Sequence, residues 1–153
     1  MRRAFEGLKR DDFAGVLVDG SADGSWYKDN PHKAMKGDWR VIPRFDQAGL
    51  DDFYAQIDVL LFLSQWKETF GLTIREALAR GIKVIQTDSG GTVEYDGAKP
   101  DEMLKIGDGP DVLQKHLNET LDAPKRACPP VRVASYGDQA TALMRLVEAL
   151  ERG

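Results

Sequence analysis

The stretch "DVLLFLSQWKETFGLTIREALARGIKVIQTDSGG", residues 58–91, decides the fold class of this chain. In its first part, 58–63, every residue after Asp58 is apolar, which is typical of a strand covered on both faces in a parallel sheet, and we expect this strand to be central. A helical pattern at 71–81 and a second buried-type strand at 83–87 follow, before a tight loop at 88–91. A strand, a helix and a strand joined by short links predict an α/β fold with a parallel sheet and right-handed crossovers.

The helix expected at 71–81 has one apolar face and a stop signal. Ile74, Ala77 and Leu78 share that face at helical spacing, and Gly81 stands where a left-handed residue closes a helix.

Two further strands and a helix are predicted before this stretch. The run at 13–20 ends in Asp-Gly and is followed by Gly, Ser, Asp and Asn, which predict a loop. A second run at 39–45 is stopped by Pro43, which cannot donate a ladder hydrogen bond. The segment 51–57 has apolar residues at helical spacing and two acids at its start, where the helix dipole favours them.

The C-terminal part of the chain predicts two helices joined by an irregular connection. The first helix spans 108–124 and ends at a proline, the connection spans 125–137, and the second helix spans 138–152 with Asp138 as its N-cap. All these elements fit one compact domain over residues 1–153.

The composition favours a small-molecule partner in a reducing compartment. With 42% hydrophobic residues in a chain of 153, one hydrophobic core can form. The net charge of −4 shows no basic face, which argues against binding to nucleic acid or anionic lipid. A single cysteine, Cys128, excludes an internal disulfide and makes a cytoplasmic location our expectation. We find no apolar run near 20 residues and no signal-peptide core, so no transmembrane segment is predicted.

The loop after the strand 58–63 is the candidate binding site. Parallel sheets bind ligands outside the carboxyl ends of their strands, where helix N-termini present unpaired N–H groups. Here the backbone amides of Phe70, Gly71 and Leu72 are expected to face such a crevice and to favour anions and sugar oxygens. Gly71 has no side chain, so a ligand can approach its backbone closely.

Two glutamates flank these amides. Glu68 is expected in the loop and Glu76 about one and a half turns inside the helix, so they cannot be a paired acid and base on one helical face. Each carboxylate can instead accept hydrogen bonds from hydroxyls at different parts of an extended ligand. A ligand with hydroxyls at both ends and anionic oxygens between them is a nucleotide diphosphate sugar.

Residues 58–95 resemble the C-terminal, donor-binding domain of retaining glycosyltransferases of the GT-B fold, the group that includes sucrose synthase and bacterial mannosyl- and glucosyltransferases. That group has two glutamates separated by seven residues, Phe-Gly just after the first, and then a strand and a Gly-Gly-x-x-Glu turn. Here the pattern falls on Glu68, Phe70, Gly71, Glu76, Gly90, Gly91 and Glu94. The resemblance extends less specifically over about 13–127, and it implies a Rossmann-like sheet flanked by helices, half of a GT-B fold.

The resemblance also implies roles for the matched residues. Glu68 contacts the donor-sugar hydroxyls near the anomeric carbon and is the candidate catalytic residue, and Glu76 holds the ribose hydroxyls. The backbone at 70–72 serves the sugar and diphosphate, the 90–91 loop lies near the phosphates, and residues 44–45, Arg44 and Phe45, contact the base. No metal is needed, because positive groups and helix dipoles stabilise the leaving diphosphate.

The chain departs from the family at its start. The family's domain begins with one more strand, whose following loop carries an Arg and a Lys that clamp the diphosphate, and "MRRAFEGLKRDDF" resembles the end of the next helix. The family's N-terminal domain, which binds the glycan or lipid-linked acceptor, has no counterpart in 153 residues. We therefore expect a fragment that by itself transfers no hexose and binds nucleotide sugar weakly if at all.

Several alternatives stay open at this point. The fold can also serve a non-catalytic nucleotide-sugar sensor or scaffold, or a nucleotide-sugar epimerase of related architecture. Glu76 can simply pair with Arg80, and the Gly-Gly pair can be only a turn. We expect Trp39 in the core, whereas Trp66 either lines the donor pocket or is only exposed. His32, His116 and Cys128 lack the neighbours that metal binding or nucleophilic chemistry requires, and we assign them none.

Overall fold

The computed structural model describes residues 1–20, 31–123 and 128–152. Its elements, in chain order, are α1 (Arg2–Glu6), β1 (Ala14–Asp19), η2 (Pro31–Ala34), β2 (Asp38–Pro43), η3 (Gln47–Gly49), α2 (Leu50–Tyr54), β3 (Val59–Phe62), α3 (Leu72–Ala79), β4 (Lys83–Asp88), η4 (Gly91–Val93), η5 (Pro100–Glu102), β5 (Leu104–Lys105), α4 (Pro110–Asp122) and α5 (Tyr136–Glu151), where η marks a 3₁₀ helix. The strands and helices predicted from the sequence are all present, although α2 ends earlier than expected. The loop predicted after β1 falls mostly outside the described residues.

The strands form two parallel sheets. In one, β1 pairs with β2 from Ala14 opposite Asp38 to Asp19 opposite Pro43. In the other, the order is β3-β4-β5, with both pairs parallel. The predicted α/β class with parallel strands is therefore confirmed. As predicted, Pro43 is the last residue of its strand.

The prediction that β3 is the central strand is wrong. Among the described strands β3 pairs only with β4, which occupies the middle of its sheet. A run of apolar residues indicates that both faces of a strand are covered. It does not indicate how many strands pair with it, so it could not predict a central position. Both faces are indeed covered: Leu61 packs against one hydrophobic cluster and Leu60 against another. All four residues of β3 nevertheless stay partly exposed.

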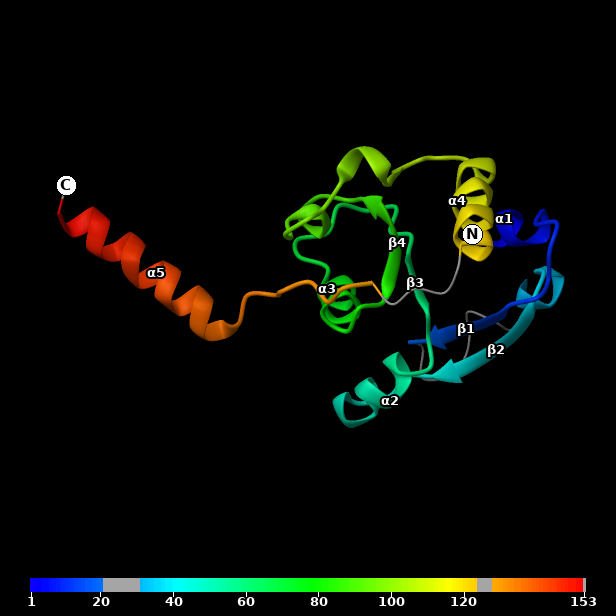
Figure 1. Cartoon of the computed structure of the whole chain (residues 1–153), viewed down its shortest axis with the longest axis horizontal. Coiled ribbons are helices and arrows are strands. Elements are labelled where there is room, and N and C mark those ends of the chain that lie inside the picture. Colours follow the sequence, from blue (N-terminus) through cyan, green and yellow to red (C-terminus); the bar gives the residue numbers. More distant parts are fainter. Residues whose placement is uncertain (21–30, 124–127, 153) are drawn as a thin grey trace.

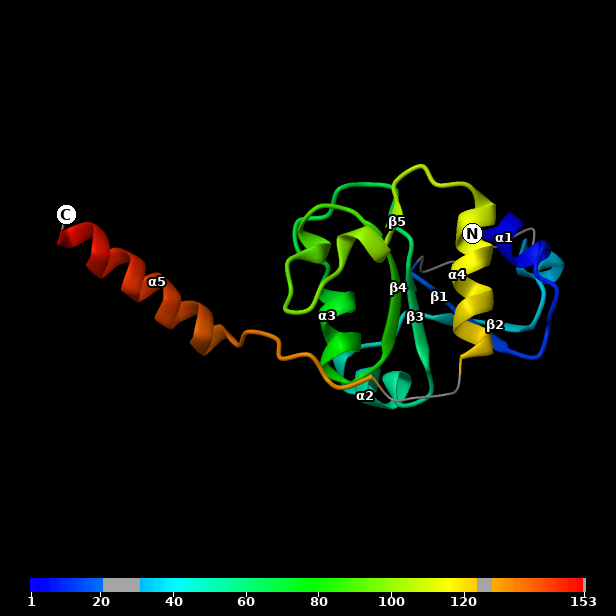
Figure 2. The same cartoon turned by 45° about the horizontal axis from the view of Figure 1, so that its top comes forward.

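Helices cover both faces of the three-stranded sheet. Figures 1 and 2 show α3 on one side of β3 and β4, and α4 with α1 on the other. The larger core cluster lies on the α4 side, and its buried members are Ala4, Phe5, Leu8, Met35, Ile85, Leu104, Leu113 and Leu117. The smaller one, Tyr54, Ala77 and Ile82, joins α2 and α3 to the sheet. Trp39 packs edge-on against Phe5, with ring centroids 4.8 Å apart, as expected for a core residue.

The end of the chain leaves this body. Cys128 N–H donates to the Gly81 carbonyl and Val131 N–H donates to that of Leu78, which fixes the connection against the end of α3. Beyond it, α5 projects away from the rest of the molecule (Figure 1), and none of its residues is buried. The expected N-cap of this helix is wrong.

The N-cap of α5 is Ser135, and Asp138 is the third helical residue. The Ser135 hydroxyl accepts from the Asp138 amide at 3.1 Å, and the Asp138 carboxylate accepts from the Ser135 amide at 2.8 Å. In such a reciprocal capping box the serine is the N-cap and the acid lies one turn inside the helix. The acid was therefore correctly linked to the start of the helix, but its position there was not.

Candidate functional site

The loop that carries Glu68 pairs with the loop that carries the Gly-Gly pair. Glu68 N–H donates to the Ser89 carbonyl at 2.8 Å, and Gly91 N–H donates to the Glu68 carbonyl at 2.9 Å. Glu68 and Gly90 thereby form an isolated parallel bridge just beyond the carboxyl ends of β3 and β4. The two parts of the motif, distant in sequence, lie side by side.

The glycines make this pairing possible. A Cβ on Gly91 would lie 2.0 Å from the Thr69 carbonyl oxygen, and one on Gly90 would lie 2.9 Å from that of Glu68. Gly90 also has a φ of +76°, which side-chain-bearing residues rarely adopt. The pair is therefore more than a turn, because only glycine lets the two loops approach so closely.

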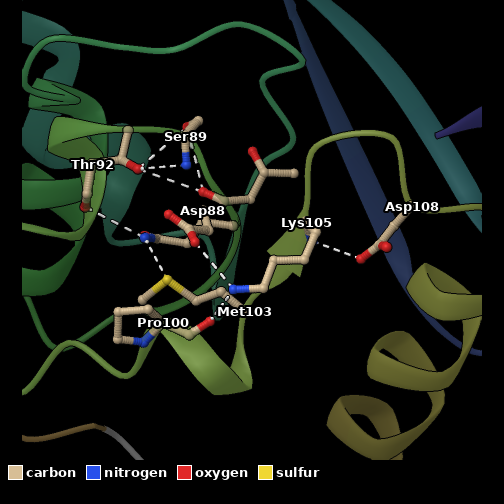
Figure 3. A network of polar contacts seen from close by, with 9 residues as sticks. Asp88, Ser89, Thr92, Pro100, Met103, Lys105 and Asp108 are labelled. Atoms are coloured by element: carbon tan, nitrogen blue, oxygen red, sulfur yellow. Dashed lines mark hydrogen bonds and ion pairs between the residues drawn. The ribbon is translucent and has the colours of Figure 1, made fainter.

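A buried hydroxyl pair supports the Gly-Gly loop from below. Ser89 and Thr92 have no exposed surface, and their hydroxyl oxygens lie 3.2 Å apart. The Ser89 amide also donates to Thr92 Oγ1 at 3.3 Å (Figure 3). These bonds close the loop around Gly90 and Gly91 and limit its freedom.

The same loop is tied to β5. Lys105 Nζ lies 3.1 Å from the Asp88 carboxylate and donates to the Pro100 carbonyl at 2.9 Å, as Figure 3 shows. The Lys105 amide donates in turn to the Asp108 carboxylate at 2.6 Å. Lys105 is thus neutralised by a partner on β4.

The carboxylate of Glu68 is half-buried and held in place. Ser64 Oγ lies 2.9 Å from Glu68 Oε1 and donates to it. The same hydroxyl accepts from the amide of Trp66 at 3.2 Å, so Ser64 fixes the backbone of the loop as well. The Trp66 side chain, 80% exposed, leaves this loop toward solvent.

The N-terminus of α3 is open to solvent. Gly71 is its N-cap, with φ +69° and ψ 61°, and the helix begins at Leu72, so the amide of Phe70 precedes the first turn rather than belonging to it. Leu72 is 64% exposed and Phe70 38%. Among the described residues, nothing accepts a hydrogen bond from the amides of Gly71 or Leu72. These donors can bind an anion or a hydroxyl.

A buried arginine that the sequence argument missed joins the two loops. The guanidinium of Arg75, a residue only 4% exposed, donates to the carbonyls of Phe70, Gly91 (3.1 Å) and Glu94 (2.9 Å). It also lies over the Phe70 ring, 3.7 Å from its centroid. Burial lowers the pKa of Arg75, and the carboxylate of Glu94 partly opposes this shift.

Glu76 faces α2. Its Oε2 accepts from the hydroxyl of Tyr54 at 3.2 Å, and that hydroxyl lies equally close to the Thr73 carbonyl. Burial, and then the negative charge of Glu76, raise the pKa of Tyr54 to about 12. The alternative that Glu76 pairs with Arg80 is wrong, since Arg80 pairs with Asp51 and bonds only the backbone carbonyl of Glu76.

A series of aromatic ring contacts leads from Phe45, one of the residues expected to contact the base, toward Glu76. Phe45 follows β2, and its ring contacts that of Phe53 at 4.9 Å between centroids. Phe53 contacts Tyr54 at 5.7 Å, and Tyr54 holds Glu76. Arg44 is exposed, and within the described part of the chain no hydrogen bond or ion pair joins it to the other predicted site residues.

The structure thus brings the predicted residues into two groups. Glu68, Phe70, Gly71, Leu72, Gly90 and Gly91 lie around the tip of α3, whereas Glu76 and Phe45 are connected through Tyr54 and Phe53. The sequence argument missed Arg75, Tyr54 and Ser64. One feature of the sequence could have indicated that Arg75 is buried. It lies four residues after Gly71 and three before Leu78, on a helical face next to the buried one.

A separate cleft opens at the carboxyl ends of β3, β4 and β5. It has a volume of about 490 Å³ and reaches from Gln65 and Thr87 to Lys105, the first turn of α4 and the N-terminal residues 1–3. None of the predicted site residues lines it.

The described residues contain neither a candidate membrane span nor a candidate metal site. No helix in this part of the chain has the length and apolar character to cross a membrane. No three His, Cys, Asp or Glu side chains there are grouped so that they can hold a metal ion.

Among family models, the family described as "Glycosyl transferases group 1" matches this chain over residues 2–128. This match covers most of the 153 residues. Neither the curated proteins nor the solved structures that were searched contain a match.

Proposed function

Because this chain belongs to the group 1 glycosyltransferases, we propose that it binds the donor of a retaining transferase, which moves a hexose from a nucleotide diphosphate sugar to a glycan or lipid-linked acceptor. The observation that carries the proposal is the bridge between Glu68 and Gly90 beside the open N-terminus of α3. It combines a carboxylate, unpaired amides and a close backbone approach in one place.

In this proposal the tip of α3 binds the anionic part of the donor. The amides of Gly71 and Leu72 have no acceptor among the described residues, and the helix dipole adds a partial positive charge there. The loop at 90–91 lies against the same segment and brings further backbone close to the diphosphate. As charge develops on the leaving diphosphate, such fixed donors stabilise it without a metal ion.

Glu68 is proposed to act on the sugar. The hydrogen bond from Ser64 holds its carboxylate beside the α3 tip, where it can accept bonds from sugar hydroxyls and stabilise positive charge at the anomeric carbon.

Glu76 is proposed to bind the ribose, with Arg44 and Phe45 near the base. The hydroxyl of Tyr54 occupies one oxygen of Glu76, which leaves the carboxylate further acceptor capacity for ribose hydroxyls. The ring contacts from Phe45 through Phe53 to the buried Tyr54 connect the proposed base region to Glu76 and support a fixed arrangement of the two.

The acceptor is proposed to bind outside these residues, as the family resemblance implies. Residues 1–153 are therefore expected to bind a donor without transferring its sugar, and a cytoplasmic location remains part of this proposal. A nucleotide-sugar sensor is the second candidate, because the buried guanidinium of Arg75 is bonded to three backbone carbonyls and so does not supply the basic clamp that the family uses on the diphosphate.

Titration of the ¹⁵N-labelled chain with UDP-glucose, GDP-mannose and ADP-glucose tests the donor proposal. One of these probes should shift the amide signals of residues 68–76 and 88–94. Glu76→Gln and Glu68→Gln should each weaken its binding about tenfold, as expected for loss of charge-assisted hydrogen bonds. The matched control is Glu119→Gln on the exposed face of α4, which should bind as the unsubstituted chain does.

Two outcomes decide between the candidates. Failure of all three probes, or shifts confined to other residues, would overturn donor binding at this site. In a full-length transferase that contains this domain, Glu68→Ala should strongly reduce turnover, whereas a normal rate would favour the sensor.

A further inference from the structure

Arg75 is the one buried cation that contacts both loops of the proposed site among the described residues. Its three acceptors are backbone carbonyls: that of Phe70 before the tip of α3, and those of Gly91 and Glu94 in and after the Gly-Gly loop. A planar guanidinium has five N–H donors in a fixed arrangement and can therefore bond carbonyls of both loops at once, whereas an ammonium group lacks this fixed arrangement.

The bond to Phe70 has a consequence for the neighbouring amide. In a trans peptide, the carbonyl of one residue and the N–H of the next point in opposite directions. When the Phe70 carbonyl points at Arg75, the N–H of Gly71 must point away from it. That amide has no acceptor among the described residues, and the segment around it is exposed.

The contact between the Arg75 guanidinium and the Phe70 ring also restricts this peptide. The guanidinium lies 3.7 Å from the centroid of the Phe70 ring, so both the side chain and the carbonyl of Phe70 are held by one group. Gly71 has no Cβ and can adopt several backbone conformations besides the left-handed one seen here, so the orientation of the preceding peptide needs such contacts to fix it.

We propose that Arg75 is a positioning residue: it orients the Phe70–Gly71 peptide and holds the two loops together, so that the Gly71 amide faces the oxygens of the donor. This inference rests on the proposed function, since it names what prepares that site for its ligand. Arg75 itself does not touch the donor. Its effect on binding passes through the backbone of residues 68–72 and 90–94.

The first test uses the unsubstituted chain. The Nη hydrogens of Arg75 should give separate, slowly exchanging NMR signals, because carbonyls hold the guanidinium and prevent its rotation. Arg145, an exposed residue of α5, is the internal control and should give averaged signals. Averaged signals from Arg75 would overturn the proposal without any mutant being made.

The second test compares Arg75→Lys and Arg75→Met with Arg145→Met, a variant at an exposed arginine of α5, a helix with no buried residue. In both Arg75 variants the amide order parameters of residues 68–72 and 90–94 should fall from about 0.85 to below about 0.6. Those of α4 should not change. Arg75→Lys keeps the charge and decides the question if Arg75→Met does not fold.

The third measurement is affinity for whichever of UDP-glucose, GDP-mannose and ADP-glucose the unsubstituted chain binds. Arg75→Lys should weaken binding by at least about tenfold, and Arg145→Met by less than about twofold. Loosened loops with unchanged affinity would overturn the orienting role. If the unsubstituted chain binds none of the probes, the proposed function fails, and rigid loops in Arg75→Lys would overturn the inference separately.

Discussion

Helices α3 and α5 are held in opposite ways. The α3 helix has eight residues, begins at a left-handed glycine without a side-chain cap, and buries Ile74, Arg75 and Ala77. The α5 helix has sixteen residues and a complete capping box, but none of its residues is buried. The shorter helix is thus fixed by its neighbours and the longer one by local interactions alone.

The difference shows what a binding site needs from a helix. Isolated helices of this length are marginal in water, so α3 depends on packing for its stability, and that packing also fixes the direction of its tip. In α5, Leu143, Leu146, Val147 and Leu150 are each more than two-fifths exposed. A helix with a good cap and no buried face presents no fixed geometry to a ligand.

The largest effect is expected from Gly91→Ala. The new Cβ would meet the Thr69 carbonyl oxygen at 2.0 Å, so the loops must separate, at a cost of about 1–3 kcal/mol. Chemical denaturation measures the loss, and amide shifts should spread over the α3 tip but not into α5. Gly20→Ala is the control, because a Cβ there meets no atom of the described residues within 4 Å. Equal stability of both variants would show that the loops are not in close contact.

An intermediate effect is expected from Tyr54→Phe, which removes the hydroxyl between α2 and α3. Loss of its hydrogen bond should cost about 1 kcal/mol near neutral pH. The pKa of Tyr54 is about 12 in the folded chain and 10.0 ordinarily. Between these values the unfolded chain releases the proton first, so the contribution of Tyr54 to stability is complete below about pH 10 and lost by about pH 12.

Denaturant titrations from pH 9 to 12 measure this contribution as the difference between the two proteins. The free energy of unfolding should fall less steeply with pH in Tyr54→Phe than in the unsubstituted chain. Parallel curves would mean that the Tyr54 hydroxyl is not buried against Glu76.

The smallest effect on the folded body is expected from Ser135→Ala. The variant loses the cap of α5, which should destabilise that helix by about 1 kcal/mol and reduce its helical amide shifts. The melting temperature of the body should not change, because α5 buries nothing. Thr141→Ala is the control on the same helix. A lower melting temperature for Ser135→Ala would show that α5 packs on the body.

Local patterns predicted most elements and failed where distant residues decide. The apolar run of β3 indicated coverage on both faces, but the number of paired edges depends on where other strands lie. The start of α5 was predicted one turn too late, at Asp138, because both Ser135 and Asp138 are cap-forming residues and Ser135 is the one that caps the helix. The pairing of Glu76 with Arg80 failed because Asp51, 29 residues earlier in the chain, is the better partner.

The sequence by itself determined the strand–helix–strand unit, the family and the residue types around the α3 tip, since periodicity, glycines and spacing are local properties. Only the tertiary structure decided that Glu68 bridges Gly90 and that Arg75 joins their loops. The burial of Arg75 could not be predicted from its position in a helical pattern, where a charged residue is expected at the surface. The three carbonyls that make its burial favourable come from two loops far apart in sequence.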